Sequence, residues 1–351
     1  MNFASDNTAG IAPEILQAII QANEGFALGY GNDAVTRRAE QRLAEFFDHE
    51  VAAFFIPTGT AANALALAHL CPPWGAVLCH AESHIVTDEC GAPEFFGGGL
   101  RLVPLPGEAG KLSVATLEAA IKRYSGHRPH QSNAAVLSLT QVTEAGTLYR
   151  SAEIAALADV AHAHGLKVHV DGARFANALE RLNTSPADLT WKAGVDAISF
   201  GATKAGAMGA EAVVFFEPSA AEFLGERRKR AGHLLSKHRF VAAQFEAFLT
   251  GDTWRRLARR GNAMAERLAR GLTAAGYAPV WPVEANLVFA LLPKALDARL
   301  KAAGATYYIR NSDFLPAGMQ PADDQMLVRL VTSFATMDAE IDRFIALVAN
   351  K

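Results

Sequence analysis

Two side chains with chemistry of their own follow two apolar runs near the middle of the chain. Val168–Val170 is a short β-branched run that ends at Asp171, and Lys204 follows the run Ala197–Phe200 after a short turn that contains glycine. In open α/β sheets, ligands bind beyond the carboxyl ends of parallel strands. The separation of 204 − 171 = 33 positions leaves room for one strand–helix unit between them. Pyridoxal phosphate needs this pair: the lysine forms a Schiff base and the acid keeps the pyridine nitrogen protonated.

Both residues also have an ordinary interpretation. Asp-Gly after a strand is a common turn, and a lone lysine after a strand is usually solvated. A second feature upstream favours the cofactor. The apolar strand Val51–Ile56 is followed by Pro57-Thr58-Gly59-Thr60 and then by a predicted helix over 61–70. A strand, a small hydroxyl-rich turn and a helix together point backbone N–H groups at an anion such as a phosphate, although Thr58 and Thr60 are also good N-caps for an ordinary helix.

A polar stretch follows the next predicted strand, Ala76–Cys79. It contains four acid and imidazole groups, which are His80, His84, Asp88 and Glu89. Such groups can bind a metal, but their spacing does not match a zinc pattern, and we expect no metal here. An imidazole stacked on a flat cofactor ring is the competing use of His84.

The composition excludes several classes of protein. The chain has 351 residues, and 33 basic against 36 acidic side chains give a net charge of −3, so we expect no nucleic-acid partner. The three cysteines have no CxxC spacing, which indicates a reducing compartment rather than a disulfide framework. We see no signal peptide and no apolar run long enough for a membrane span, so we expect a cytoplasmic protein.

The elements that position these residues alternate along the chain. Strands and helices follow one another over some 150 residues from about residue 51, which predicts a mainly parallel sheet covered on both faces. The apolar run Ala212–Phe216 follows Lys204 so closely that we expect it to return antiparallel. The segment 220–275 is predicted to be nearly all helical, with a break at Gly251-Asp252. Short strands and helices come after Pro282.

This order divides the chain into three parts. We expect residues 1–48 to form an N-terminal arm with two helices, residues 49–248 a large cofactor-binding α/β domain, and residues 249–351 a smaller C-terminal α/β domain.

At this point the motifs resemble a known family. They are similar to those of the pyridoxal phosphate-dependent low-specificity L-threonine aldolases, which have fold type I, the fold of aspartate aminotransferase. Seven motifs in the family's order span almost the whole chain. They are Ser5-Asp6-Asn7-Thr8, Gly29-Tyr30-Gly31-Asn32-Asp33, Pro57-Thr58-Gly59-Thr60-Ala61-Ala62-Asn63, His84-Ile85 with Asp88-Glu89, His169-Val170-Asp171-Gly172-Ala173-Arg174, Thr203-Lys204, and Arg329-Leu330-Val331-Thr332. The run Ser236-Lys237-His238-Arg239-Phe240 resembles one branch of that family in particular. The resemblance implies a large, mainly parallel seven-stranded sheet and a smaller C-terminal domain.

The resemblance also implies roles for the residues that hold the cofactor. Lys204 would carry it covalently, Asp171 would pair with the pyridinium nitrogen and His84 would stack on the ring. Arg174 would approach the ring hydroxyl and the substrate carboxylate. The phosphate would lie at the start of a helix, held by Gly59 and Thr60 with Thr58 helping.

Other matching positions would bind the substrate or complete the site. Ser5 and Arg329 match positions that bind the substrate carboxylate. Tyr30 matches a segment that completes such sites across a dimer interface. The cation for the phosphate would be either Lys237 or Arg230, from the same chain or from a neighbouring subunit. We therefore expect a homo-oligomer, either a dimer or a tetramer.

One position departs from the family. Many members have a histidine in the loop after the strand equivalent to 134–139, where it is proposed to act on the β-hydroxyl of the substrate. That position matches Thr143 here. A threonine hydroxyl hardly ionises at neutral pH and is a poor general base, so the proton acceptor is left open between water, the cofactor phosphate and another histidine.

The expected activity is a retro-aldol cleavage of L-threonine, L-allo-threonine and related L-β-hydroxy-α-amino acids to glycine and an aldehyde. Another enzyme of the same fold is the first alternative: a phenylserine aldolase, a β-eliminating lyase or an aminotransferase. The second is a binding or structural protein that has lost turnover, against which the intact Lys204 and Asp171 argue.

Overall fold

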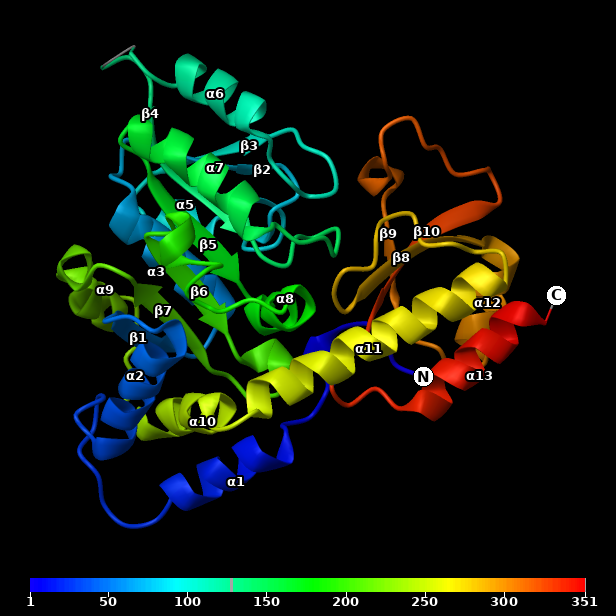
Figure 1. The fold of residues 1–351 in the computed structure, drawn as a ribbon, viewed down its shortest axis with the longest axis horizontal. Coiled ribbons are helices and arrows are strands. Elements are labelled where there is room, and N and C mark those ends of the chain that lie inside the picture. Colours follow the sequence, from blue (N-terminus) through cyan, green and yellow to red (C-terminus); the bar gives the residue numbers. More distant parts are fainter. Residues whose placement is uncertain (127–128, 351) are drawn as a thin grey trace.

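The computed structural model describes residues 1–126 and 129–350 and contains two β-sheets with helices packed on them (Figure 1). The larger sheet has seven strands. In spatial order they are β1 (Ala52–Ile56), β7 (Glu211–Phe215), β6 (Ala197–Gly201), β5 (Lys167–Gly172), β4 (Asn133–Thr140), β2 (Gly75–His80) and β3 (Arg101–Leu105). Only β7 runs against its neighbours, pairing antiparallel with both β1 and β6. The predicted mainly parallel sheet and the antiparallel return after Lys204 are both confirmed.

Helices cover both faces of this sheet, which explains why its strands are apolar on both sides. One face packs against α3 (Gly59–Leu70), α5 (Ala92–Phe96) and α9 (Leu224–Arg230). The other face packs against α2 (Ala34–Phe47), α6 (Val114–Arg123), α7 (Ser151–Ala163), α8 (Phe175–Leu182) and α10 (Arg239–Leu249). The short helix α4 (His84–Thr87) follows β2 at the carboxyl end of the strand.

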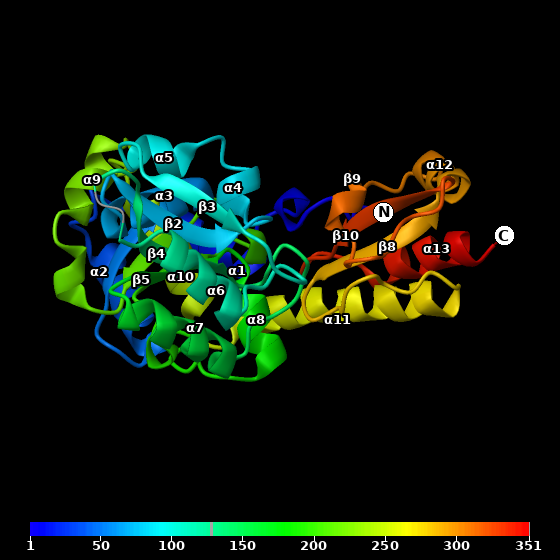
Figure 2. The same ribbon diagram turned by 90° about the horizontal axis from the view of Figure 1, so that it is seen from above.

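The smaller sheet belongs to the C-terminal part of the chain. Its three antiparallel strands lie in the order β8 (Leu287–Pro293), β10 (Gln325–Val331) and β9 (Tyr308–Arg310). This sheet packs with α12 (Lys294–Ala302), α13 (Asp338–Ala349) and the long helix α11 (Thr253–Ala274) around a second apolar core. Figure 2 shows α11 running beneath the small sheet from the region of the large one. Residue 249 as a domain boundary stays a prediction.

The N-terminal segment touches both halves of the molecule. Phe3 is fully buried in the second core, and its backbone hydrogen-bonds to Thr306 and Val331. Further along, α1 (Pro13–Ala22) packs on α10. The residues between these two anchors therefore pass the carboxyl edge of the large sheet, where the predicted site lies. Within the described residues, no helix has the length and apolar character needed to cross a membrane.

Candidate active site

The predicted catalytic residues meet at two adjoining cavities between the large sheet and the small one. An outer pocket of about 510 Å³ includes Ser5 and Arg329 in its lining. A deeper cavity of about 30 Å³ includes Gly59, Thr60 and Asp171. Both cavities are lined by the same four residues, which are His84, Glu144, Arg174 and Lys204. We call these four the junction residues.

Close packing of β5 against β6 brings the acid and the lysine to this edge. Asp171 is the last residue but one of β5, and Lys204 lies in a short 3₁₀ turn after β6. A side chain at Gly172 would meet the carbonyl of Ser199 at 2.9 Å, and one at Gly201 would meet the backbone of Ala173 at the same distance. Glycine is therefore required at both strand ends. Among the described residues Lys204 makes no hydrogen bond or ion pair, so its amine is available.

Asp171 is the end of a buried polar chain that the sequence did not reveal. Its Oδ1 accepts from the backbone N–H of Ala173 at 3.0 Å, and its Oδ2 accepts from the amide of Asn63 at 2.9 Å. Asn63 also donates to Glu89 Oε1 at 2.8 Å, and the same oxygen lies 2.9 Å from His84 Nδ1. The hydrogen bond to Glu89 raises the pKa of His84 above its usual value, although burial opposes the shift. The chain fixes the orientation of Asp171 and His84 together.

Arg174 is held by a residue far away in sequence. Asp6 accepts from its Nε at 2.6 Å and from its Nη2 at 3.0 Å, and both side chains are almost fully buried. Burial opposes ionisation of Asp6, yet the charge and hydrogen bonds of Arg174 hold the pKa of Asp6 below its usual value. Asn286 donates to the same carboxylate at 3.1 Å. Asp6 was part of a recognised motif, but nothing in the sequence indicated its partner.

The turn after β1 leads into α3, where the sequence predicted a site for an anion. Gly59 and Thr60 are the first two residues of α3 and line the deeper cavity. Among the described residues, their backbone N–H groups have no acceptor. Thr58 is the N-cap, and its exposed side chain accepts from the N–H of Ala61 at 3.3 Å. Its hydroxyl is thus engaged in capping and lies outside the lining of the cavity.

Of the residues predicted to bind substrate, Ser5 and Arg329 line the outer pocket and Tyr30 does not. Tyr30 is half exposed, and its ring lies 4.4 Å from the ammonium of Lys229. Lys237 and Arg230 are also exposed and lie outside both linings. Within a single chain, Tyr30, Lys237 and Arg230 therefore do not lie beside Lys204.

The loop after β4 places Glu144, and not Thr143, at the two cavities. Thr143 is buried, and its hydroxyl bonds the Thr147 hydroxyl at 2.8 Å, the N–H of Thr147 at 3.1 Å and the carbonyl of Ala109 at 3.2 Å. These bonds commit it to the turn. The next residue, Glu144, lines both cavities instead. Sequence reasoning missed Glu144, because a shift of one position along a loop reverses which side chain faces the cavity.

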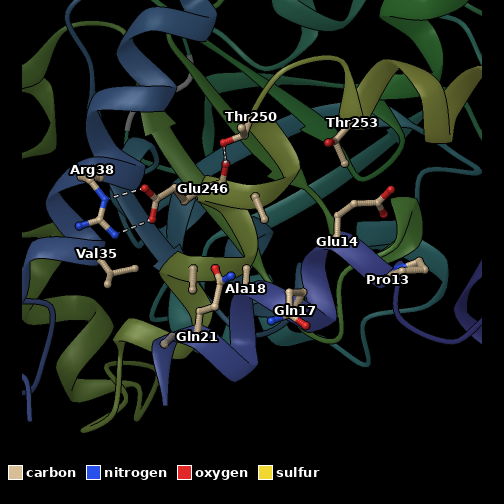
Figure 3. A pocket seen from close by; sticks show the side chains of 13 residues that line it. Pro13, Glu14, Gln17, Ala18, Gln21, Val35, Arg38, Glu246, Thr250 and Thr253 are labelled. Atoms are coloured by element: carbon tan, nitrogen blue, oxygen red, sulfur yellow. Dashed lines mark hydrogen bonds and ion pairs between the residues drawn. The ribbon is translucent and has the colours of Figure 1, made fainter. Parts of the chain in front are cut away.

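A more spacious pocket lies elsewhere among the described residues. It has a volume of about 770 Å³ and lies between α1, α2 and α10 (Figure 3). Its charged lining includes Arg38 and Glu246, which pair with each other at 2.6 Å. None of the predicted site residues lines it. The volume of a pocket alone therefore does not identify the candidate active site. The unpaired Lys204 and the buried Asp171 identify it.

The residues that line the deeper cavity fit pyridoxal phosphate. The unpaired amine of Lys204 matches the aldehyde of the cofactor. The Asp171 carboxylate, which is buried and oriented by two donors, matches the ring nitrogen. The two free backbone N–H groups at the start of α3 match the phosphate. The half-exposed imidazole of His84 is held by Glu89 and is available to stack on a ring.

Comparisons with known proteins agree with this fit. The model of the family described as beta-eliminating lyase matches residues 2–295. A low specificity L-threonine aldolase of Pseudomonas aeruginosa is 44% identical over 308 residues, covering 87% of this chain and 88% of that protein. The solved structure of Leishmania major threonine aldolase superposes with a TM-score of 0.91 at 29% identity, over 99% of this chain and 98% of that one. Serine palmitoyltransferase of Sphingomonas wittichii shares the fold, with a TM-score of 0.74 at 19% identity over 99% of this chain and 86% of that one.

Proposed function

Because this chain belongs to the beta-eliminating lyase family and, within it, to the low-specificity L-threonine aldolases, we propose that the junction residues cleave L-β-hydroxy-α-amino acids to glycine and an aldehyde. The observation that carries the assignment of the site is the unpaired Lys204, which borders both the cavity that fits the cofactor and the pocket that opens to solvent. The cofactor of these enzymes is pyridoxal 5′-phosphate. When bound, it supplies an electron sink for the electrons left on Cα as the Cα–Cβ bond breaks.

Six residues that line the deeper cavity have distinct proposed tasks in holding the cofactor. Lys204 holds its aldehyde carbon, and Asp171 keeps a proton on its ring nitrogen. Asn63 orients Asp171 through the hydrogen bond of 2.9 Å. The N–H groups of Gly59 and Thr60 bind the phosphate, and the imidazole of His84 covers the ring.

The proposed substrate-binding residues differ from those that hold the cofactor. Arg329 takes the α-carboxylate, with Ser5 as a further donor. Arg174 can donate to the carboxylate only with the part of its guanidinium that faces away from Asp6, because its Nε and Nη2 already donate to Asp6. Fixing the carboxylate sets the orientation of the Cα–Cβ bond, which is the main contribution of positioning to such a cleavage.

Glu144 is the proposed acceptor of the β-hydroxyl proton. It is the carboxylate among the junction residues, it is nine-tenths buried, and it has no hydrogen-bond donor among the described residues. A partly desolvated carboxylate within reach of the substrate hydroxyl is a competent general base. His84 is the alternative, with Glu89 on one ring nitrogen and the other ring nitrogen available.

We also propose that the working form is a homo-oligomer. An exposed apolar segment supports this: Phe26, Leu28 and Tyr30 are all at least 49% exposed on one loop. Tyr30 and Lys237 then reach the site of a neighbouring subunit. The three cysteines are all free thiols, which supports a reducing compartment such as the cytoplasm.

The decisive experiment is aldehyde release by the cofactor-loaded protein. Wild type should release acetaldehyde from L-threonine and L-allo-threonine, and Lys204→Ala should release none. The ratio of the two rates reports the preference at the β-carbon. A yellow protein that released aldehyde from neither substrate nor from phenylserine would indicate a transaminase or lyase of the same fold instead.

A further inference from the structure

The outer pocket contains more positive charge than an α-carboxylate needs. Three arginines line it, which are Arg174, Arg310 and Arg329. Arg174 is neutralised by Asp6. Among residues 1–126 and 129–350, neither Arg310 nor Arg329 has an ion pair within 4.0 Å, and the buried Nε atom of each has no hydrogen-bond acceptor. Arg310 was not among the residues predicted from sequence.

The small sheet places the two free arginines on one face. In the antiparallel pair of β9 and β10, Arg329 lies opposite Tyr308, and Arg310 lies opposite Leu327. Residues opposite each other share a face, as do residues two apart on one strand. Arg310 and Arg329 therefore both project from the face that meets the pocket, and Tyr308 between them lines it as well.

Arg310 is held in place rather than free to turn to solvent. Its guanidinium carbon lies 5.0 Å from the ring centroid of Phe314. Phe314 is itself buried, with its ring 5.0 Å from that of Phe289, and its carbonyl accepts from the indole of Trp281 at 3.1 Å. A guanidinium stacked on a fixed ring is pre-organised for a planar anion.

The charges in the pocket favour the binding of more than one anionic group. Burial is the main cause that lowers the pKa of Arg329 to about 10; the neighbouring charges of Arg174 and Arg310 act in the same direction, while Glu144 and Asp6 oppose the shift. A buried guanidinium without a partner is costly. The α-carboxylate of the substrate satisfies one of the two free arginines, and the other remains without an acceptor.

We propose that Arg310 binds a second carboxylate on the β-carbon of the substrate, so that the site also cleaves dicarboxylic L-β-hydroxy-α-amino acids, of which 3-hydroxyaspartate is the simplest. This inference rests on the proposed function above. The Cα–Cβ bond breaks, the β-hydroxyl loses its proton and becomes a carbonyl, and a proton is added at Cα. The products are glycine and glyoxylate, and no oxidant or further reactant is needed.

The test compares two substrates on the holoenzyme. Wild type should release glyoxylate from L-3-hydroxyaspartate and acetaldehyde from L-threonine. Arg310→Gln should lower kcat/KM for hydroxyaspartate by roughly 10- to 100-fold, the usual size of a lost charge-assisted contact, and change kcat/KM for threonine by less than about 3-fold. Arg343→Gln is the matched control, because Arg343 is an exposed arginine on α13 that donates to the carbonyl of Ala303.

A binding measurement checks the same contact without turnover of a dicarboxylic substrate. L-Aspartate should inhibit threonine cleavage more strongly than L-alanine, and Arg310→Gln should remove the difference. Release of acetaldehyde but no glyoxylate would overturn the inference and leave the proposed function standing. An equal loss on both substrates in Arg310→Gln would also overturn it, by making Arg310 a second ligand of the α-carboxylate. Release of neither aldehyde, together with no aldehyde from phenylserine, would overturn both proposals.

Discussion

Asp6 and Arg174, which lie 168 positions apart in sequence, form a buried ion pair with two hydrogen bonds of 2.6 and 3.0 Å. The pair ties the N-terminal segment to the carboxyl end of β5 and aims the guanidinium at the junction between the two cavities. It couples the position of the chain terminus to the geometry of the site.

The first prediction concerns this pair. Asp6→Asn leaves the buried charge of Arg174 without its partner, and breaking such a pair costs about 3–5 kcal/mol. The free energy of unfolding in urea at pH 7 should fall by about that amount. Since the folded pKa of Asp6 is depressed, its contribution is present above the unfolded pKa and is lost as pH falls through the folded pKa.

The difference between wild type and Asp6→Asn should therefore shrink only below about pH 4. Ser5→Ala is the control, because it removes a neighbouring hydroxyl whose hydrogen bond to Asp6 is 3.3 Å long and leaves the charges intact. Equal stability of wild type and Asp6→Asn at pH 7 would show that Arg174 finds another partner.

A second prediction concerns Glu144. Glu144→Gln should lower kcat for threonine cleavage by about 100-fold or more, the usual contribution of a general base. Exchange of the α-proton of glycine with D₂O, followed by NMR, should continue near the wild-type rate, because glycine binds in the same way and has no β-hydroxyl. A parallel loss of both activities would make Glu144 a residue that shapes the pocket rather than a base.

A third prediction concerns the imidazole over the cofactor site. The hydrogen bond that the His84 imidazole donates to the Glu89 carboxylate is the largest cause of the raised pKa of His84. Glu89→Gln should therefore lower the pKa of His84, because the partner loses its charge while the amide keeps similar dimensions. NMR titration of the imidazole measures the shift directly. Glu82→Gln, on the same segment, is the matched control, and an unchanged His84 titration in Glu89→Gln would contradict the assignment.

A fourth prediction concerns His169, which is fully buried between the hydroxyls of Ser138 and Ser199, each 3.0 Å away. Burial lowers its pKa to about 4. The unfolded chain binds this proton near pH 6.5 and the folded chain does not, so stability should fall as pH drops from 7 to 5.

The contribution of His169 to that fall is about 2 kcal/mol, from a shift of between two and three pKa units. His169→Gln keeps a polar side chain that does not titrate, and it should show a shallower loss of unfolding free energy over this range. The same slope in both proteins would show that His169 takes up its proton in the folded state.

Local signals in the sequence were enough to place the elements that carry the chemistry. Periodicity placed Asp171 and Lys204 at the ends of neighbouring strands, and Gly59 and Thr60 at a helix start, because each of these signals lies within a few residues of the side chain it positions. The alternation of strands and helices predicted a parallel sheet, since parallel neighbours need crossover connections.

Which side chains meet depends on how distant segments of the chain pack together. Asn63 reaches Asp171 across 108 positions, and Arg310 and Arg329 enter the pocket from a separate sheet. Glu144 faces the cavity while Thr143 is bonded into its own turn. Contacts of this kind depend on how separate elements pack and on the direction of a side chain in a loop, which no local pattern in the sequence encodes.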